Sequence, residues 1–205
     1  MLEVQTLIAA ARTGDGARVG SVRTGDQALV AVSLGDPSVP QGVVAAQHVV
    51  RVALEHPAAP SAEALAGRLR EADHQVRALA APGLASGAVL AVRPGRIEGA
   101  SVGDLSVWCF SLEGRRVELT AMENHRPLLG SGEAQVVPFK TTFAGGTVVV
   151  ACDAVWQLAG IDAIAEVARS GRPIADLTEA IVDLSRLETG ALVAPVGLAV
   201  VRVSG

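Results

Sequence analysis

The stretch Thr147 to Trp156, TVVVACDAVW, joins a short apolar run to an acidic residue. Three consecutive valines and an alanine show no alternation of polar and apolar residues, which is typical of a strand buried on both faces. Asp153 ends the run, and apolar residues at helical spacing follow it. The pattern predicts a buried strand and then a helix, with Asp153 either capping that helix or holding a charged ligand.

The composition predicts one globular domain, spanning residues 1–205, with an ordinary core. Half of the residues are hydrophobic, but no apolar run approaches the ~20 residues that cross a bilayer. The N-terminal stretch has no basic region ahead of its apolar part, so we expect a cytoplasmic protein without a membrane partner. Cys109 and Cys152 each lie in an apolar run, which predicts buried free thiols.

The charge argues against nucleic acid as the main partner. The net charge is −4, and all but one of the 17 basic residues are arginines spread along the chain. Tyrosine is absent and aromatic residues make up only 2% of the chain. The core is therefore expected to consist of valine, leucine, alanine and isoleucine, with few aromatic surfaces on which bases could stack.

The order of predicted elements indicates an α+β fold. Strands are expected at residues 2–12, 17–23, 28–34, 84–93, 96–102, 104–112, 115–121, 133–139, 147–152 and 196–203. Helices are expected at residues 41–55, 61–79, 154–169 and 173–187. Runs of strands that alternate with pairs of helices favour antiparallel sheets with helices packed outside them.

Several loops at strand ends carry an aspartate beside a glycine. These aspartates are Asp15, Asp26, Asp36 and Asp104, and Asp153 ends a strand as well. Gly-Asp is a common turn dipeptide, so each of them could serve a turn alone. Carboxylates gathered at one edge are also the ligands that Mg²⁺ and Mn²⁺ prefer.

The linear order of motifs resembles the metal-dependent type-2C protein phosphatases (the PPM family). The matching runs are Ala100–Phe110 (ASVGDLSVWCF), Leu119-Thr120, Asn124-His125, Leu129-Gly130 and Gly146–Ala154 (GTVVVACDA). They follow one another as the family's "VGDSR", "LT…H…LG" and "SDG" segments do. The short length and the Gly-Asp at Asp15 look most like the small bacterial RsbX-type stressosome phosphatases and SpoIIE-type sporulation phosphatases.

This resemblance implies a four-layer αββα sandwich of two antiparallel sheets flanked by helix pairs. It also implies two Mn²⁺ or Mg²⁺ ions at one end of the sandwich and a bridging water that attacks a phosphoserine or phosphothreonine. Carried over by position, Asp15 matches the first metal aspartate and Asp153 matches the aspartate of the "SDG" segment. Gly35 matches a glycine whose carbonyl is a metal ligand.

The sequence departs from the family at two metal ligands. The motif "VAVADG" reads Val30–Gly35 (VAVSLG), so Leu34 stands where the bridging aspartate is expected. The closing "DNxT" motif reads Ala194–Gly197 (APVG), so a second carboxylate is missing. Asp36 and Glu188 are candidate substitutes. The sequence thus predicts weak or single-site binding of Mn²⁺ or Mg²⁺, or no metal binding.

Three readings of the function follow. The first is a phosphatase-fold regulatory protein of a bacterial serine-phosphorylation switch, with weak or no phosphatase activity, that binds a protein partner, such as a phosphoserine-regulated protein. The second is an active Mn²⁺- or Mg²⁺-dependent phosphoserine/phosphothreonine hydrolase with a rearranged site, and the third is a small structural domain without a metal site. In the first two readings Arg12 is a candidate for contacting phosphate, because it lies three residues before Asp15.

Overall fold

The computed structural model describes residues 1–9, 16–55, 60–120 and 126–204. In these ranges the strands form two antiparallel sheets of five strands each. The first sheet has the order β1-β10-β9-β6-β7, and the second has the order β2-β3-β4-β5-β8. Their bounds are β1 Leu2–Ala9, β2 Ala17–Thr24, β3 Gln27–Gly35, β4 Ala85–Arg93, β5 Gly95–Val102, β6 Leu105–Ser111, β7 Arg116–Glu118, β8 Val137–Phe143, β9 Gly146–Cys152 and β10 Val196–Val203.

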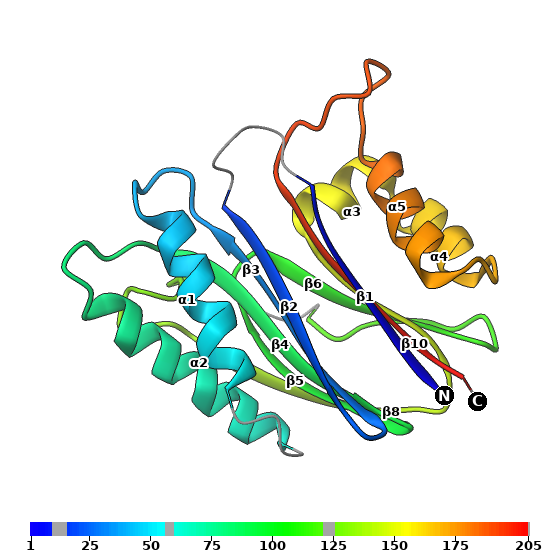
Figure 1. The fold of residues 1–205 in the computed structure, drawn as a ribbon, viewed down its shortest axis with the longest axis horizontal. Coiled ribbons are helices and arrows are strands. Elements are labelled where there is room, and N and C mark those ends of the chain that lie inside the picture. Colours follow the sequence, from blue (N-terminus) through cyan, green and yellow to red (C-terminus); the bar gives the residue numbers. More distant parts are fainter. Residues whose placement is uncertain (10–15, 56–59, 121–125, 205) are drawn as a thin grey trace.

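Helices cover the outer faces of both sheets, as Figure 1 shows. Helices α1 (Gly42–Leu54) and α2 (Ala62–Arg77) pack on the second sheet. The first sheet is covered by α3 (Asp153–Ala159), α4 (Ile161–Arg169) and α5 (Ile174–Leu184). The layers therefore run helix, sheet, sheet, helix, and the predicted α+β sandwich is confirmed.

The buried strands read as continuous apolar runs because they have a core on each face. In β3, Val30 and Val32 belong to the core between the sheets, whereas Leu29 and Ala31 belong to the core beneath α1 and α2. Successive side chains of a strand point to opposite faces, so a strand between two cores has no polar face. Full burial of each valine or leucine side chain contributes roughly 1.5–3 kcal/mol.

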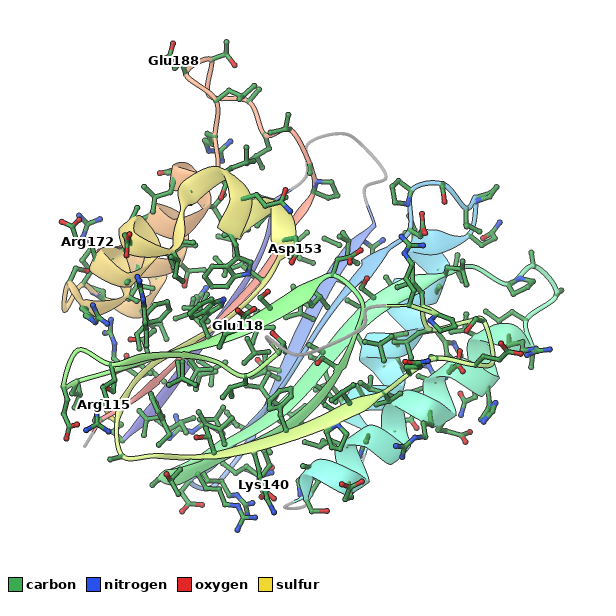
Figure 2. The ribbon with its side chains drawn as sticks, turned by 180° about the vertical axis from the view of Figure 1, so that it is seen from behind. Arg115, Glu118, Lys140, Asp153, Arg172 and Glu188 are labelled. Carbon is green, nitrogen blue, oxygen red and sulfur yellow. The ribbon has the colours of Figure 1, made fainter. Side chains whose placement is uncertain are left out.

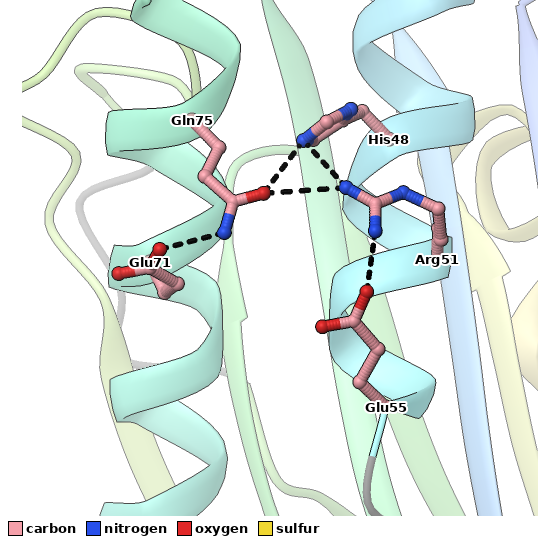
Figure 3. Close-up of polar contacts among 5 residues, drawn as sticks. All are labelled: His48, Arg51, Glu55, Glu71 and Gln75. Carbon is pink, nitrogen blue, oxygen red and sulfur yellow. Dashed lines mark hydrogen bonds and ion pairs between the residues drawn. The ribbon is translucent and has the colours of Figure 1, made fainter.

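Helices α1 and α2 are also joined by a polar network on their solvent side (Figure 3). His48 Nε2 lies 2.9 Å from Gln75 Oε1, and Arg51 contacts both of these residues and Glu55. Gln75 Nε2 donates to Glu71 Oε1 at 2.6 Å. His48 is thus a half-buried side chain whose ring is held by partners on both helices.

Some element boundaries predicted from the sequence are wrong, and the strand expected at 115–121 is only β7, Arg116–Glu118. The helix expected at residues 154–169 is two helices, because Gly160 adopts φ 76° between α3 and α4, a conformation that ends a helix. The strand expected at 133–139 lies at Val137–Phe143 instead, where it pairs with β5. In the described ranges, none of the helices is long and apolar enough to span a membrane.

Candidate functional site

The register of the strands brings one end of each sheet together. We call this end the strand-end edge and define it by Leu34, Gly35, Asp36, Asp104, Asp153 and Pro195. Leu34 pairs with Ser86 at the start of β4, and Leu105 at the start of β6 pairs with Cys152 at the end of β9. Pro195 precedes β10, and its carbonyl accepts a hydrogen bond from the Cys152 thiol at 3.4 Å.

Asp104 and Asp153 are direct neighbours at this edge. The backbone N–H of Asp153 donates to the carbonyl of Asp104 at 3.3 Å. The backbone N–H of Asp104 donates in turn to Ser86 Oγ at 3.1 Å. The Ser86 carbonyl accepts from the buried Ser33 Oγ at 2.6 Å. This chain of contacts links the two sheets and holds two acidic residues on adjacent strand ends.

Asp153 occupies the first turn of α3 and does not cap it. The N-cap residue is Cys152, and its side chain makes no capping hydrogen bond. The capping interpretation of Asp153 is therefore wrong, although a carboxylate in the first turn interacts favourably with the helix dipole. Asp153 is half-buried, at the end of the strand where the sequence predicted it.

Gly35 lies where two segments of backbone come into close contact. Its N–H donates to the Gly16 carbonyl at 3.1 Å, which ties the end of β3 to the start of β2. A Cβ atom at Gly35 would lie 2.3 Å from the carbonyl carbon and oxygen of Gly42, at the start of α1. This position therefore requires glycine for steric reasons, and its role as a carbonyl ligand stays a prediction.

The two positions that lack the expected carboxylates have other contacts. Leu34 is half-buried and packs against the core between the sheets. Pro195 is also half-buried and supplies only its carbonyl to Cys152. An apolar side chain anchored in the core cannot coordinate a cation. The structure thus places a leucine where the resemblance implies a ligand shared by two ions.

Among the described residues, the candidate substitutes Asp36 and Glu188 form no metal-binding group with Asp153. Asp36 Oδ1 accepts hydrogen bonds from Ser38 N at 2.9 Å and from Ser38 Oγ at 2.6 Å. These bonds lower the pKa of Asp36 below its usual value, and the charge of Arg126 adds a smaller effect of the same sign. Glu188 is exposed on the loop after α5, and Figure 2 shows it at the tip of that loop, away from Asp153.

Arg12 and Asp15 lie outside the described residues, and their roles stay predictions. Within the described part of the chain, no group of three or more His, Cys, Asp or Glu side chains is arranged to hold a metal ion. The described residues of the strand-end edge therefore do not fit a two-metal site. The acidic residues that this edge brings into backbone contact are Asp104 and Asp153.

Reasoning from the sequence had recognised Asp104 as a turn aspartate but had not placed it in the site. The signal was present, because the "VGD" run and the "ACD" run each put an aspartate at one end of a buried strand. Their contact depends on the β6–β9 register, which local sequence does not determine.

Solved structures confirm the fold. A bacterial serine phosphatase superposes with a TM-score of 0.84 at 12% identity, covering 100% of this chain and 99% of that one. The chain has the type-2C phosphatase fold. RsbX in complex with magnesium matches with a TM-score of 0.75 at 10% identity, covering 99% and 94% of the two chains.

A third match is a structure of the bacterial stressosome, described as a modular system that has been adapted to control secondary messenger signalling. Its TM-score is 0.76 at 19% identity, with 98% of this chain and 100% of that chain covered. The sequence itself matches no protein-family model and no curated protein. At these identities the likeness establishes the phosphatase fold and leaves the activity to the residues.

Proposed function

We propose that this protein is a regulatory, protein-binding member of the phosphatase fold in a bacterial serine-phosphorylation switch, with weak or no phosphatase activity. The observation that carries the proposal is Leu34, a half-buried side chain that packs against the core at a position where the resemblance implies a bridging carboxylate. Pro195, beside the end of β9, is the second position where the resemblance implies a carboxylate ligand. Likeness in fold to RsbX and to a stressosome component supports a signalling context.

A two-metal phosphatase uses its ions to activate water and to stabilise charge on phosphorus. Mn²⁺ or Mg²⁺ would supply that chemistry here only if bound, and Asp153 with Asp104 is the pair of acids that the described edge offers. Two dications held by so few anions would repel one another strongly. At most one weakly held ion therefore fits this proposal, with Asp15 as a further candidate ligand.

The second candidate function is an active phosphatase with a rearranged site. The observation in its favour is the backbone hydrogen bond between Asp153 and Asp104, because it brings two acidic residues to adjacent strand ends, where they are candidate ligands for one cation. A phosphoserine peptide assay with and without Mn²⁺ separates the two functions. The regulatory function predicts no metal-dependent phosphate release above background, and steady turnover would favour the active enzyme.

A repair variant makes this assay more informative. Leu34→Asp combined with Pro195→Asp restores carboxylates at both departing positions, and each lies at a strand end near water. If only ligands are missing, the double variant gains Mn²⁺ binding or phosphatase activity over the parent. A folded double variant that gains neither would show that these two positions do not correspond to the family's ligands.

The strand-end edge is also the proposed contact face for the protein partner. Its described loops include Gly35–Pro40 and Arg126, which is exposed and close enough to influence Asp36. Arginine suits a phosphorylated or acidic partner because it pairs with both groups. A pull-down from the native host, repeated with Arg12→Ala, Asp15→Ala and Arg126→Ala, tests this face. Recovery of the same partner with all three variants would exclude it.

A further inference from the structure

A hollow of about 410 Å³ lies at the other end of the first sheet. We call it the basic hollow. Phe110 and Leu112 form one wall, and Ala168, Arg169, Arg202 and Val203 lie around it. These residues come from the end of β6, the end of α4 and the end of β10, so the hollow is opposite the strand-end edge. Its apolar surface includes Leu112, which is 73% exposed.

The basic hollow continues past the β6–β7 hairpin. A second hollow of about 580 Å³ shares Ser111 and Leu112 with it and is lined further by Val117 and Phe143. Val117 is 49% exposed, so apolar surface extends on both sides of Leu112. A site in two adjoining parts suits an extended segment of several residues better than one compact small molecule.

Arginines gather at this end although the whole chain carries a net charge of −4. Arg169 lies over the Phe110 ring at 5.9 Å and donates to the Gly114 carbonyl at 2.6 Å. Arg202 donates to the Arg172 carbonyl at 2.6 Å and lies 3.8 Å from Glu3. Each guanidinium has five N–H donors, so these contacts leave donors for a ligand.

The lining of the basic hollow itself is positive. Its charged members among the described residues are Arg169 and Arg202, and none of the described residues that line it is an Asp or Glu. Figure 2 shows Arg115 and Arg172 at this end, away from Asp153. Acidic residues occur nearby but outside the lining, such as Glu3 beside Arg202. The field inside the hollow therefore favours a negatively charged ligand.

We propose that the basic hollow binds an extended acidic peptide segment of a partner protein. An apolar side chain of the segment packs against Phe110 and Leu112, and neighbouring carboxylates pair with Arg169 and Arg202. Arginine and carboxylate form charge-assisted hydrogen bonds, and the apolar wall adds buried area at the same place. This surface is independent of the strand-end edge, so the chain could hold two proteins at its two ends.

The probe is an acetylated and amidated five-residue peptide with a leucine between two aspartates, added to the full isotope-labelled chain. Amide resonances of Leu112, Gly146 and Val203 are expected to shift in a saturable manner. A peptide with asparagines in place of the aspartates is expected to bind about fivefold more weakly, because the exposed ion pairs are lost. Raising the salt concentration is also expected to weaken the binding of the acidic peptide, because salt screens exposed ion pairs.

Three variants locate the site. Arg202→Gln is expected to weaken binding of the acidic peptide about fivefold, because an ion pair is lost. Leu112→Ser is expected to weaken it by a similar factor, because an apolar contact is lost. Leu112 is mostly exposed, so its variant keeps the fold even if Arg202→Gln is less stable. Arg70→Gln, an exposed arginine on α2, is the matched control and leaves binding unchanged.

Binding of the asparagine peptide with the affinity of the acidic one would overturn the proposal. So would resonance shifts confined to the strand-end edge, or the absence of any saturable shift. A metal-free chain serves for every arm of this experiment, so its result does not depend on whether the strand-end edge binds Mn²⁺.

Discussion

The carboxylate of Asp73 accepts a hydrogen bond from the backbone N–H of Gly130 at 2.6 Å, although 57 residues separate the two. Asp73 Oδ1 also accepts from Gly132 N at 2.9 Å, and Oδ2 accepts from Ala134 N at 3.2 Å. One buried side chain of α2 therefore fixes the loop that carries the Leu129-Gly130 motif. Through Leu129, which pairs with Ala85, this loop adjoins the strand-end edge.

Asp73→Ala is expected to lower the free energy of unfolding by about 2–4 kcal/mol, because it leaves three backbone donors without their acceptor. Urea unfolding followed by circular dichroism measures the change. Glu179→Ala, at an exposed site on α5, is the control and should stay within about 0.5 kcal/mol of the parent. If Asp73→Ala loses no more free energy of unfolding than the control does, the Asp73 carboxylate does not stabilise the Gly130 loop as proposed.

Gly35→Ala is expected to destabilise the fold, because the new methyl group would meet the Gly42 backbone at 2.3 Å and backbone cannot swing aside. We expect a cost of about 2 kcal/mol or more. Gly67→Ala is the opposite case, since a Cβ there meets open space on α2 and alanine favours the helix by about 1 kcal/mol. Thermal unfolding of the two variants should shift in opposite directions, and equal shifts would refute the steric account.

Ser38→Ala should raise the pKa of Asp36 toward its ordinary value of 3.8, because it removes the Ser38 hydroxyl hydrogen bond, which is the largest cause of the lowered pKa. A carboxylate with a lowered pKa in the folded state stabilises the fold above the unfolded pKa, and this contribution is lost as pH falls through the folded pKa. The Ser38→Ala variant should therefore lose less of its free energy of unfolding than the parent does between neutral and acid pH. Carbon-13 NMR titration of the Asp36 carboxyl measures the pKa directly. Arg126→Gln, the smaller cause, should move it less.

Both cysteines should resist thiol reagents in the folded protein. Burial raises the pKa of Cys109 to about 12 and also raises the pKa of Cys152, so little thiolate exists at pH 8. Ellman's reagent at pH 8 should react slowly with the native chain and rapidly with both thiols in denaturant. Rapid reaction of the native protein would show that the β6 and β9 strands open readily.

The sequence predicted the parts of this fold that local pattern determines. The valine run of β9 was correctly predicted as a strand buried on both faces, and β3 and β10 were correctly predicted as strands. Asp153 was correctly expected at the end of a strand, whereas the match of Leu34 to a ligand position stays a prediction. Each of these inferences needs only side-chain type and spacing along a few residues.

Long-range contacts were not predictable in the same way. The Asp73 carboxylate looks like an ordinary polar residue in a helix until α2 meets the loop near Gly130. The contact between Asp104 and Asp153 likewise depends on the pairing of β6 with β9. The end of α3 at Gly160 was missed because the apolar spacing runs on across the glycine, whose φ of 76° breaks the helix.

In the proposed function, Leu34 prevents a two-metal site at the strand-end edge. Calorimetric titration of the metal-free chain with Mn²⁺, with the variant Leu34→Asp titrated in parallel, measures this. We expect at most one weakly bound ion for the parent and tighter or additional binding for Leu34→Asp, because the variant gains a carboxylate ligand. Two tightly bound Mn²⁺ ions per parent chain would contradict it.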